Sequence, residues 1–155
     1  MKKGRRLAID VGKVRIGLAV CDIEGILATP LSAIARSIPD DDSLNEIAAI
    51  ADENQVIEVY VGDPIALSGG TTASTKDARD FAEKLAAWID IPVRLVDERL
   101  TTVTASSKLR LSGKDSREAK SLIDSASAVE ILEQVLLTIK SSQVEPGKLT
   151  GEDHA

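Results

Sequence analysis

Three acidic side chains stand where apolar segments of the sequence begin or end, and they are the strongest candidates for chemistry. Asp10 closes an apolar run, Glu98 follows the apolar segment 92–96, and Asp124 lies among small residues early in a long amphipathic segment. A carboxylate next to a core is costly unless it is paired, hydrogen-bonded or bound to a metal. Each acid also has a plainer explanation: a local turn for Asp10, an ion pair with Arg99 for Glu98, and a favourable helix N-terminus for Asp124.

Carboxylates that converge from separate elements suit a hard divalent cation. Mg²⁺, or Mn²⁺ in its place, prefers oxygen ligands and shares its coordination with substrate phosphates. Two such ions roughly 3.5–4 Å apart can promote hydrolysis of a phosphodiester. We therefore expect Asp10, Glu98 and Asp124 to be metal ligands and catalytic residues. Asp97 is the alternative to Glu98: neighbouring strand residues point to opposite faces, so we expect only one of the two to meet Asp10.

Other kinds of site find little support in the composition. The chain has a single histidine, His154, and a single cysteine, Cys21. Histidine-based acid–base catalysis and zinc sites built from several histidines or cysteines are therefore not expected. Tyr60, Phe81 and Trp88 are the only aromatic residues, so a platform for stacking single-stranded bases is not expected either.

The charge is unevenly distributed along the chain. The net charge is −6, yet residues 1–36 carry seven Lys or Arg and three acids, and residues 94–120 carry seven and four. Phosphate contacts depend on local patches and not on the total, although such runs are equally often solvated faces. The glycines of the loop 62–75 leave backbone N–H groups free, and the positive end of the following helix points at this loop, so the loop is a candidate phosphate site. Together with the basic residues, the candidate phosphate contacts are Lys13, Arg15, Gly62, Arg99, Lys108, Arg110, Lys114 and Arg117.

The order of elements predicts a mixed α/β sheet. Three β-rich runs within residues 5–35 are separated by short turns, which indicates antiparallel hairpins. Helical and strand-like segments then alternate, which demands parallel pairing. We expect five strands, three antiparallel and then two parallel, with helices on both faces. Helices are predicted at 101–111 and 119–140.

Length and hydropathy indicate one domain. The 155 residues can bury a core without disulfides. We expect a domain over residues 1–140 and a polar, disordered tail over residues 141–155. No signal peptide and no membrane-spanning run is evident, so we expect a cytoplasmic protein.

Four motifs in order resemble the YqgF/RuvX family over about residues 5–137. They are DVGKVRIGLA from Asp10, VGDP from Val61, DERLTT from Asp97 and IDSASA from Ile123. The resemblance implies an RNase H-like fold related to the RuvC resolvases. It also maps the metal-site acids onto Asp10, Glu98 and Asp124, with Asp97 as the less favoured choice for the second. Family members are described as Holliday junction resolvases or as nucleases that process the 5′ end of pre-16S rRNA.

Two positions depart from the family pattern. Asp63 stands where an apolar residue is usual, and Ser127 interrupts a run of small apolar residues. Asp63 adds negative charge to the expected phosphate seat, and could be a further metal ligand. Neither departure alters the three main acids.

The sequence leaves three functions open. The first is a metal-dependent endonuclease acting on structured RNA or branched DNA, with pre-ribosomal particles as candidate partners, as a monomer or as a homodimer. The second is a nucleic-acid-binding ribosome-assembly factor without catalysis. The third is a nucleotide-binding relative of the actin-like ATPases, which is disfavoured because those proteins place the nucleotide between two such domains.

Overall fold

The computed structural model describes residues 2–64, 69–98, 120, 122–142 and 145–150. The predicted helix at 101–111 lies outside these residues. The elements are, in chain order, β1 (Arg5–Val11), β2 (Arg15–Cys21), β3 (Ala28–Ala35), α1 (Asp41–Glu53), β4 (Val56–Asp63), α2 (Ala73–Trp88), β5 (Val93–Asp97), α5 (Ala126–Ser142) and β6 (Lys148–Leu149).

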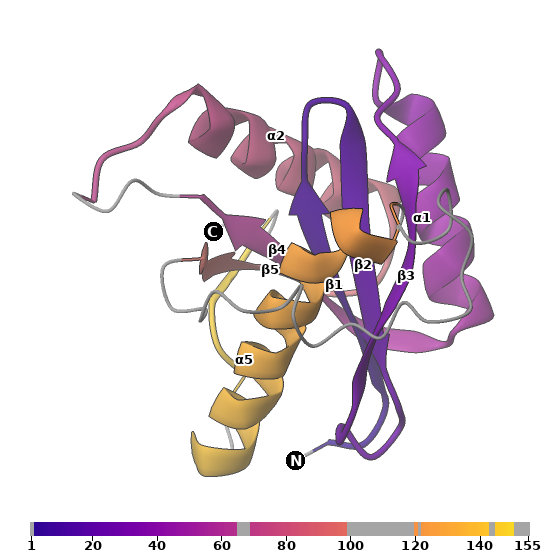
Figure 1. Cartoon of the computed structure of the whole chain (residues 1–155), viewed down its shortest axis with the longest axis vertical. Helices are drawn as coiled ribbons and strands as arrows, with labels where there is room; N and C mark the ends of the chain where they lie inside the picture. Colours follow the sequence, from indigo (N-terminus) through magenta and orange to yellow (C-terminus); the bar gives the residue numbers. More distant parts are fainter. Residues whose placement is uncertain (1, 65–68, 99–119, 121, 143–144, 151–155) are drawn as a thin grey trace.

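The sheet is mixed, and its strand order is β3-β2-β1-β4-β5-β6 (Figure 1). β1 and β2 pair antiparallel, as do β2 and β3. β4 joins β1 in parallel and β5 joins β4 in parallel. This is the predicted arrangement of three antiparallel strands followed by two parallel ones.

The two faces of the sheet carry separate apolar layers. Alternate residues of the strands point to opposite faces, so Leu7 and Ile9 pack with α1 and α2, whereas Ala8 packs with α5. Small residues predominate beneath α5, where Ala8 and Ala19 belong to the layer. Helices therefore cover both faces, as predicted, and α5 lies close to the sheet (Figure 1).

The strand count differs from the prediction. A sixth strand, β6, pairs antiparallel with β5 through Leu149 and Lys148. It falls within residues 141–155, for which no ordered structure was expected. A strand of two residues is too short to show the alternation of apolar and polar residues that predicts strands. Its pairing depends on contacts with β5, which is distant in the sequence.

The last predicted helix, 119–140, is divided at Ser125. Residues 122–124 are helical, but a turn at Ser125 separates them from α5. The side chain of Ser125 is hydrogen-bonded to two strands of the sheet, accepting from Leu18 N at 3.0 Å and donating to Leu31 O at 2.7 Å. These bonds hold the chain against the sheet just where the helix would otherwise have continued.

Candidate functional site

The candidate site lies where the parallel strands end. β1, β4 and β5 run in the same direction, so their carboxyl ends meet at one edge of the sheet, where sites collect in α/β proteins. Asp10 is the penultimate residue of β1, and Glu98 directly follows β5. The sheet itself thus brings two of the predicted acids to one edge.

Asp10 faces α5. It is two residues beyond Ala8, which packs under that helix, and its carboxylate accepts a hydrogen bond from the side chain of Ser127. Burial raises the pKa of Asp10, and the Ser127 bond partly offsets this rise. A buried carboxylate with a raised pKa in the site is suited to exchange a proton or to accept a cation.

Glu98 is the most perturbed acid of the site. Its pKa is raised to about 7, first by burial and then by the negative charges of Asp10, Asp63 and Asp97. The charge of Asp10 contributes to this rise, so the two carboxylates repel each other. The side chain of Glu98 lies directly over Gly62 of β4.

Asp124 lies beside β2 and is held by the bonds of its neighbour Ser125. Its carboxylate forms ion pairs with Arg15 at 3.5 Å and with Lys120 at 3.8 Å. Its Oδ2 atom is buried and has no hydrogen bond with the described residues. The Arg15 contact is therefore electrostatic and leaves that oxygen able to accept a further ligand.

The three main acids do not meet in one cluster. Within the part of the chain that the structure describes, no group of three or more Asp, Glu, His or Cys side chains is arranged to hold a metal ion. Asp10 and Glu98 interact, while Asp124 is paired with cations. Two mutually repelling, partly buried carboxylates nevertheless form an all-oxygen donor set that fits a hard divalent cation.

Asp97 and Asp63 belong to the other face. They are register partners on β5 and β4. Strand alternation puts them on the α2 side, and Asp63 accepts two hydrogen bonds from Arg79 of α2, at 2.9 and 3.0 Å. Asp63 is thus engaged by a guanidinium. The geometry favours Glu98 over Asp97 as the partner of Asp10.

The basic candidates divide into two groups. Lys13 and Arg15 are exposed in and beside the β1–β2 turn, next to Asp10. Arg99, Lys108, Arg110, Lys114 and Arg117 lie outside the described residues. Gly62 lies beneath Glu98, which gives it a geometric role that the sequence did not indicate.

Arg36 was missed by the sequence reasoning. Its guanidinium donates to Gly12 O at 3.0 Å, to both oxygens of Asp77 at 2.9 Å, and to Asp40 at 2.7 Å. It also lies over the ring of Phe81, 5.0 Å from the centroid. It thereby ties the turn that follows Asp10 to α1 and α2. These contacts join distant segments, so no local pattern could have revealed them.

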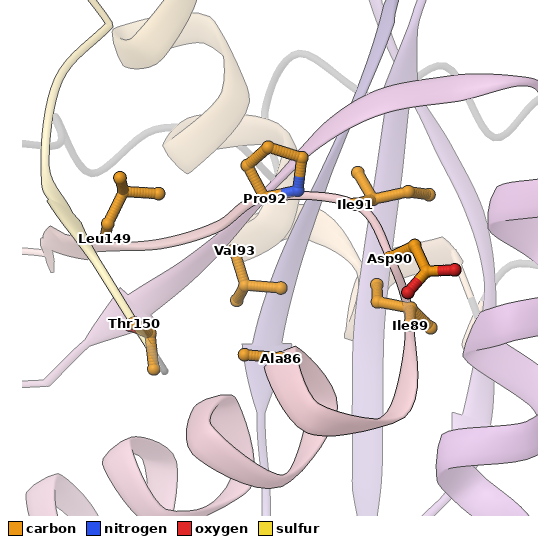
Figure 2. Close-up of a pocket in the computed structure, with 8 residues that line it drawn as sticks. All are labelled: Ala86, Ile89, Asp90, Ile91, Pro92, Val93, Leu149 and Thr150. Carbon is orange, nitrogen blue, oxygen red and sulfur yellow. The ribbon is translucent and has the colours of Figure 1, made fainter. Parts of the chain in front are cut away.

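A pocket of about 290 Å³ lies away from these acids. Figure 2 shows that residues 89–93, Ala86 of α2, and Leu149 and Thr150 line it. Val93 opens β5, whereas Glu98 follows its last residue. The pocket is therefore at the opposite end of that strand.

No helix among the described residues is long and apolar enough to cross a membrane.

Comparison with solved structures defines the class of the fold. The structure of T. thermophilus RuvC in complex with a Holliday junction substrate superposes with a TM-score of 0.61 at 16% identity, covering 92% of this chain and 99% of that one. A second T. thermophilus RuvC structure gives a TM-score of 0.55. The chain has the RNase H-like fold of RuvC.

Comparison of sequences defines the family. A family profile described as "RuvX: Holliday junction resolvase" matches residues 4–138. The "Putative pre-16S rRNA nuclease" of Clavibacter michiganensis subsp. michiganensis is 49% identical over 149 residues, covering 96% of this chain and 92% of the relative. That of Streptomyces avermitilis is 46% identical over 150 residues, covering 96% and 95%. The chain belongs to the RuvX family.

Proposed function

We propose that the chain is a nuclease that hydrolyses phosphodiester bonds in the maturation of pre-16S rRNA. The observation that carries this proposal is the near-full-length similarity, at 46–49% identity, to relatives named as pre-16S rRNA nucleases. The paired carboxylates at the edge of the sheet supply a chemical basis for it. A cytoplasmic location, as expected from the sequence, accords with ribosome assembly in the bacteria that carry these relatives.

Asp10 and Glu98 would be the first ligands of a divalent cation, Mg²⁺ or Mn²⁺. Their mutual repulsion favours a cation between them, and Oδ2 of Asp124, which makes no hydrogen bond with the described residues, can complete the set once Arg15 releases it. When bound, such a cation neutralises phosphate charge and lowers the pKa of a water molecule. Ser127 keeps the carboxylate of Asp10 oriented through its hydrogen bond.

Lys13 and Arg15 would contact the nucleic-acid backbone beside these acids. Both are exposed next to the carboxyl end of β1. The ion pair of Arg15 with Asp124 is long, 3.5 Å, and half of the Arg15 side chain, 51%, is exposed. Because the pair is long and the Arg15 side chain is half exposed, Arg15 can turn from the carboxylate to a phosphate. Pre-ribosomal particles are the expected partners.

The test compares two substrates, because the family profile carries the description of a Holliday junction resolvase. Purified protein is incubated with a pre-16S 5′-leader RNA and with a four-way DNA junction, in Mg²⁺, Mn²⁺ or EDTA. We expect metal-dependent cleavage of the RNA. Asp10→Asn should abolish it while the protein stays folded.

The matched control is Asp90→Asn. Asp90 is exposed and lines the pocket at the far end of β5, so this variant should cleave like the wild type. Cleavage of the junction alone would assign the chain to DNA resolution. Binding without cleavage, unchanged by Asp10→Asn and by EDTA, would contradict the nuclease proposal and favour an assembly factor.

A further inference from the structure

Two glycines flank Asp10 within the sheet. Asp10 stands opposite Gly17 in the β1–β2 register. On the other side Ile9 stands opposite Val61, so Gly62 is the next position along β4. Strand alternation turns Asp10 and both glycine positions towards α5. Asp10 thus has a position without a side chain on either side.

Backbone conformation does not explain either glycine. The described glycines with positive φ are Gly4, Gly25, Gly69 and Gly147. Gly17 and Gly62 are therefore in conformations that any residue can adopt, and a glycine within a strand weakens it. A glycine inside a strand often marks a place where another group approaches closely.

At Gly62 that group is the carboxylate of Glu98. A Cβ added at Gly62 would collide with Oε2 of Glu98 and would lie 2.9 Å from its Cδ and 2.7 Å from Cδ1 of Ile131. Real Cβ atoms essentially never approach another atom so closely, so the ends of the flexible Glu98 and Ile131 side chains would have to move. Without a side chain at this position, the Glu98 carboxylate can lie against the backbone of β4, one strand away from Asp10.

At Gly17 the group is the backbone around Asp124. A Cβ there would lie 2.5 Å from the carbonyl oxygen of Asp124 and 3.1 Å from Cα of Ser125. This backbone cannot easily retreat, because Ser125 is bonded to Leu18 and Leu31 of the sheet. The missing side chain lets the segment before α5 rest on β2.

We infer that Gly17 and Gly62 are positioning residues, which seat Asp124 and Glu98 on either side of Asp10. The inference deepens the proposed function, since it rests on these three acids forming the active site. Because glycine has no side chain, Gly17 and Gly62 each leave a shallow depression in the surface of the sheet, which we call a seat. The backbone of Asp124 then lies over β2 and the carboxylate of Glu98 over β4, the two strands that flank β1 and Asp10.

The decisive test is a double-mutant cycle on the metal-free protein. Gly62→Ala is made in the wild type, in Glu98→Asp and in Ile131→Val, and unfolding is followed in urea. Glu98→Asp shortens the side chain by one methylene and vacates the seat. We expect it to reduce the effect of Gly62→Ala on the unfolding equilibrium constant at least tenfold. If Gly62→Ala alone does not fold, Glu98→Asp should restore folding.

The Ile131→Val background is the matched control, because it removes the other atom that the new methyl group meets. Relief by Ile131→Val and none by Glu98→Asp would show that Gly62 only prevents overpacking of the core, and would overturn the inference. This cycle does not depend on cleavage. If Glu98→Asp relieves the effect of Gly62→Ala but the protein cleaves neither substrate, the proposed function is refuted and the inference about Gly62 stands.

Metal binding and amide exchange provide the readout for the site. Mn²⁺ affinity, measured by electron paramagnetic resonance of the free ion, should fall at least tenfold in Gly62→Ala and in Gly17→Ala. Gly17→Ala should also speed hydrogen exchange of the Leu18 amide, which is bonded to Ser125 Oγ. Unchanged Mn²⁺ affinity with slowed or unchanged exchange at Leu18 would contradict the seat at Gly17.

Discussion

Glu98 should make the stability of the metal-free protein depend on pH. Its pKa is raised from 4.5 to about 7, by burial first and then by Asp10, Asp63 and Asp97. Because the folded protein holds this proton more tightly than the unfolded chain, the stabilisation is complete below about pH 4.5 and is lost as the pH rises through 7. Replacement by glutamine, which cannot ionise, should remove this loss.

The magnitude follows from the same values. One pH unit of pKa difference corresponds to about 1.4 kcal/mol, so the full difference is roughly 3 kcal/mol. Glu98 is only partly buried, and solvent screening lowers the expected loss to about 2 kcal/mol. Above pH 7, Mg²⁺ should restore this stability, since a bound cation compensates the ionised pair Asp10 and Glu98.

The assay is urea unfolding in EDTA at half-unit steps from pH 4.5 to pH 8.5. Wild type, Glu98→Gln and the control Glu83→Gln are compared, where Glu83 is an exposed residue of α2. We expect the wild type and Glu83→Gln to lose stability together, and Glu98→Gln to give a flatter curve. Parallel curves for all three proteins would refute the reasoning, because Glu98 would then ionise equally in both states.

Two further predictions concern the residues that hold the site in place. Ser125→Ala takes the side-chain partner from a buried amide and from a partly buried carbonyl, so the free energy of unfolding should fall by about 3 kcal/mol. Ser141→Ala, on an exposed part of α5, should change it little, and equal effects of the two variants would contradict the role of Ser125. Arg36→Gln removes the bidentate partner of Asp77 and leaves Asp40 with Lys84 alone, and should cost about 3 kcal/mol at pH 7. The pKa of Asp77 is lowered chiefly by its hydrogen bond from Arg36. Burial raises the pKa of Asp40, but hydrogen bonds from Arg36 and Lys84 lower it by more. The stabilisation by these ionised carboxylates is therefore present above pH 4 and lost below it, so an equal loss of unfolding free energy in Arg36→Gln at pH 3 would refute this account.

Local patterns in the sequence were sufficient for much of the fold. Hydrophobic period and turn residues predicted the first three strands, the parallel pair and the helices on both faces, and the structure confirms this arrangement. The same patterns placed Asp10 and Glu98 at strand ends, and alternation indicated that only one of Asp97 and Glu98 would face Asp10, whereas the preference for Glu98 came from the family resemblance. These inferences hold because side-chain direction in a strand depends only on the local backbone.

Tertiary structure alone decided how the acids are seated. Ser125 interrupts the last helix through bonds to Leu18, 107 residues away, and to Leu31, 94 residues away. The pair of Asp63 with Arg79 and the position of Gly62 beneath Glu98 likewise depend on packing between separate elements. A sequence pattern records the preferences of one segment, whereas these positions are set by which atoms of distant segments compete for the same space.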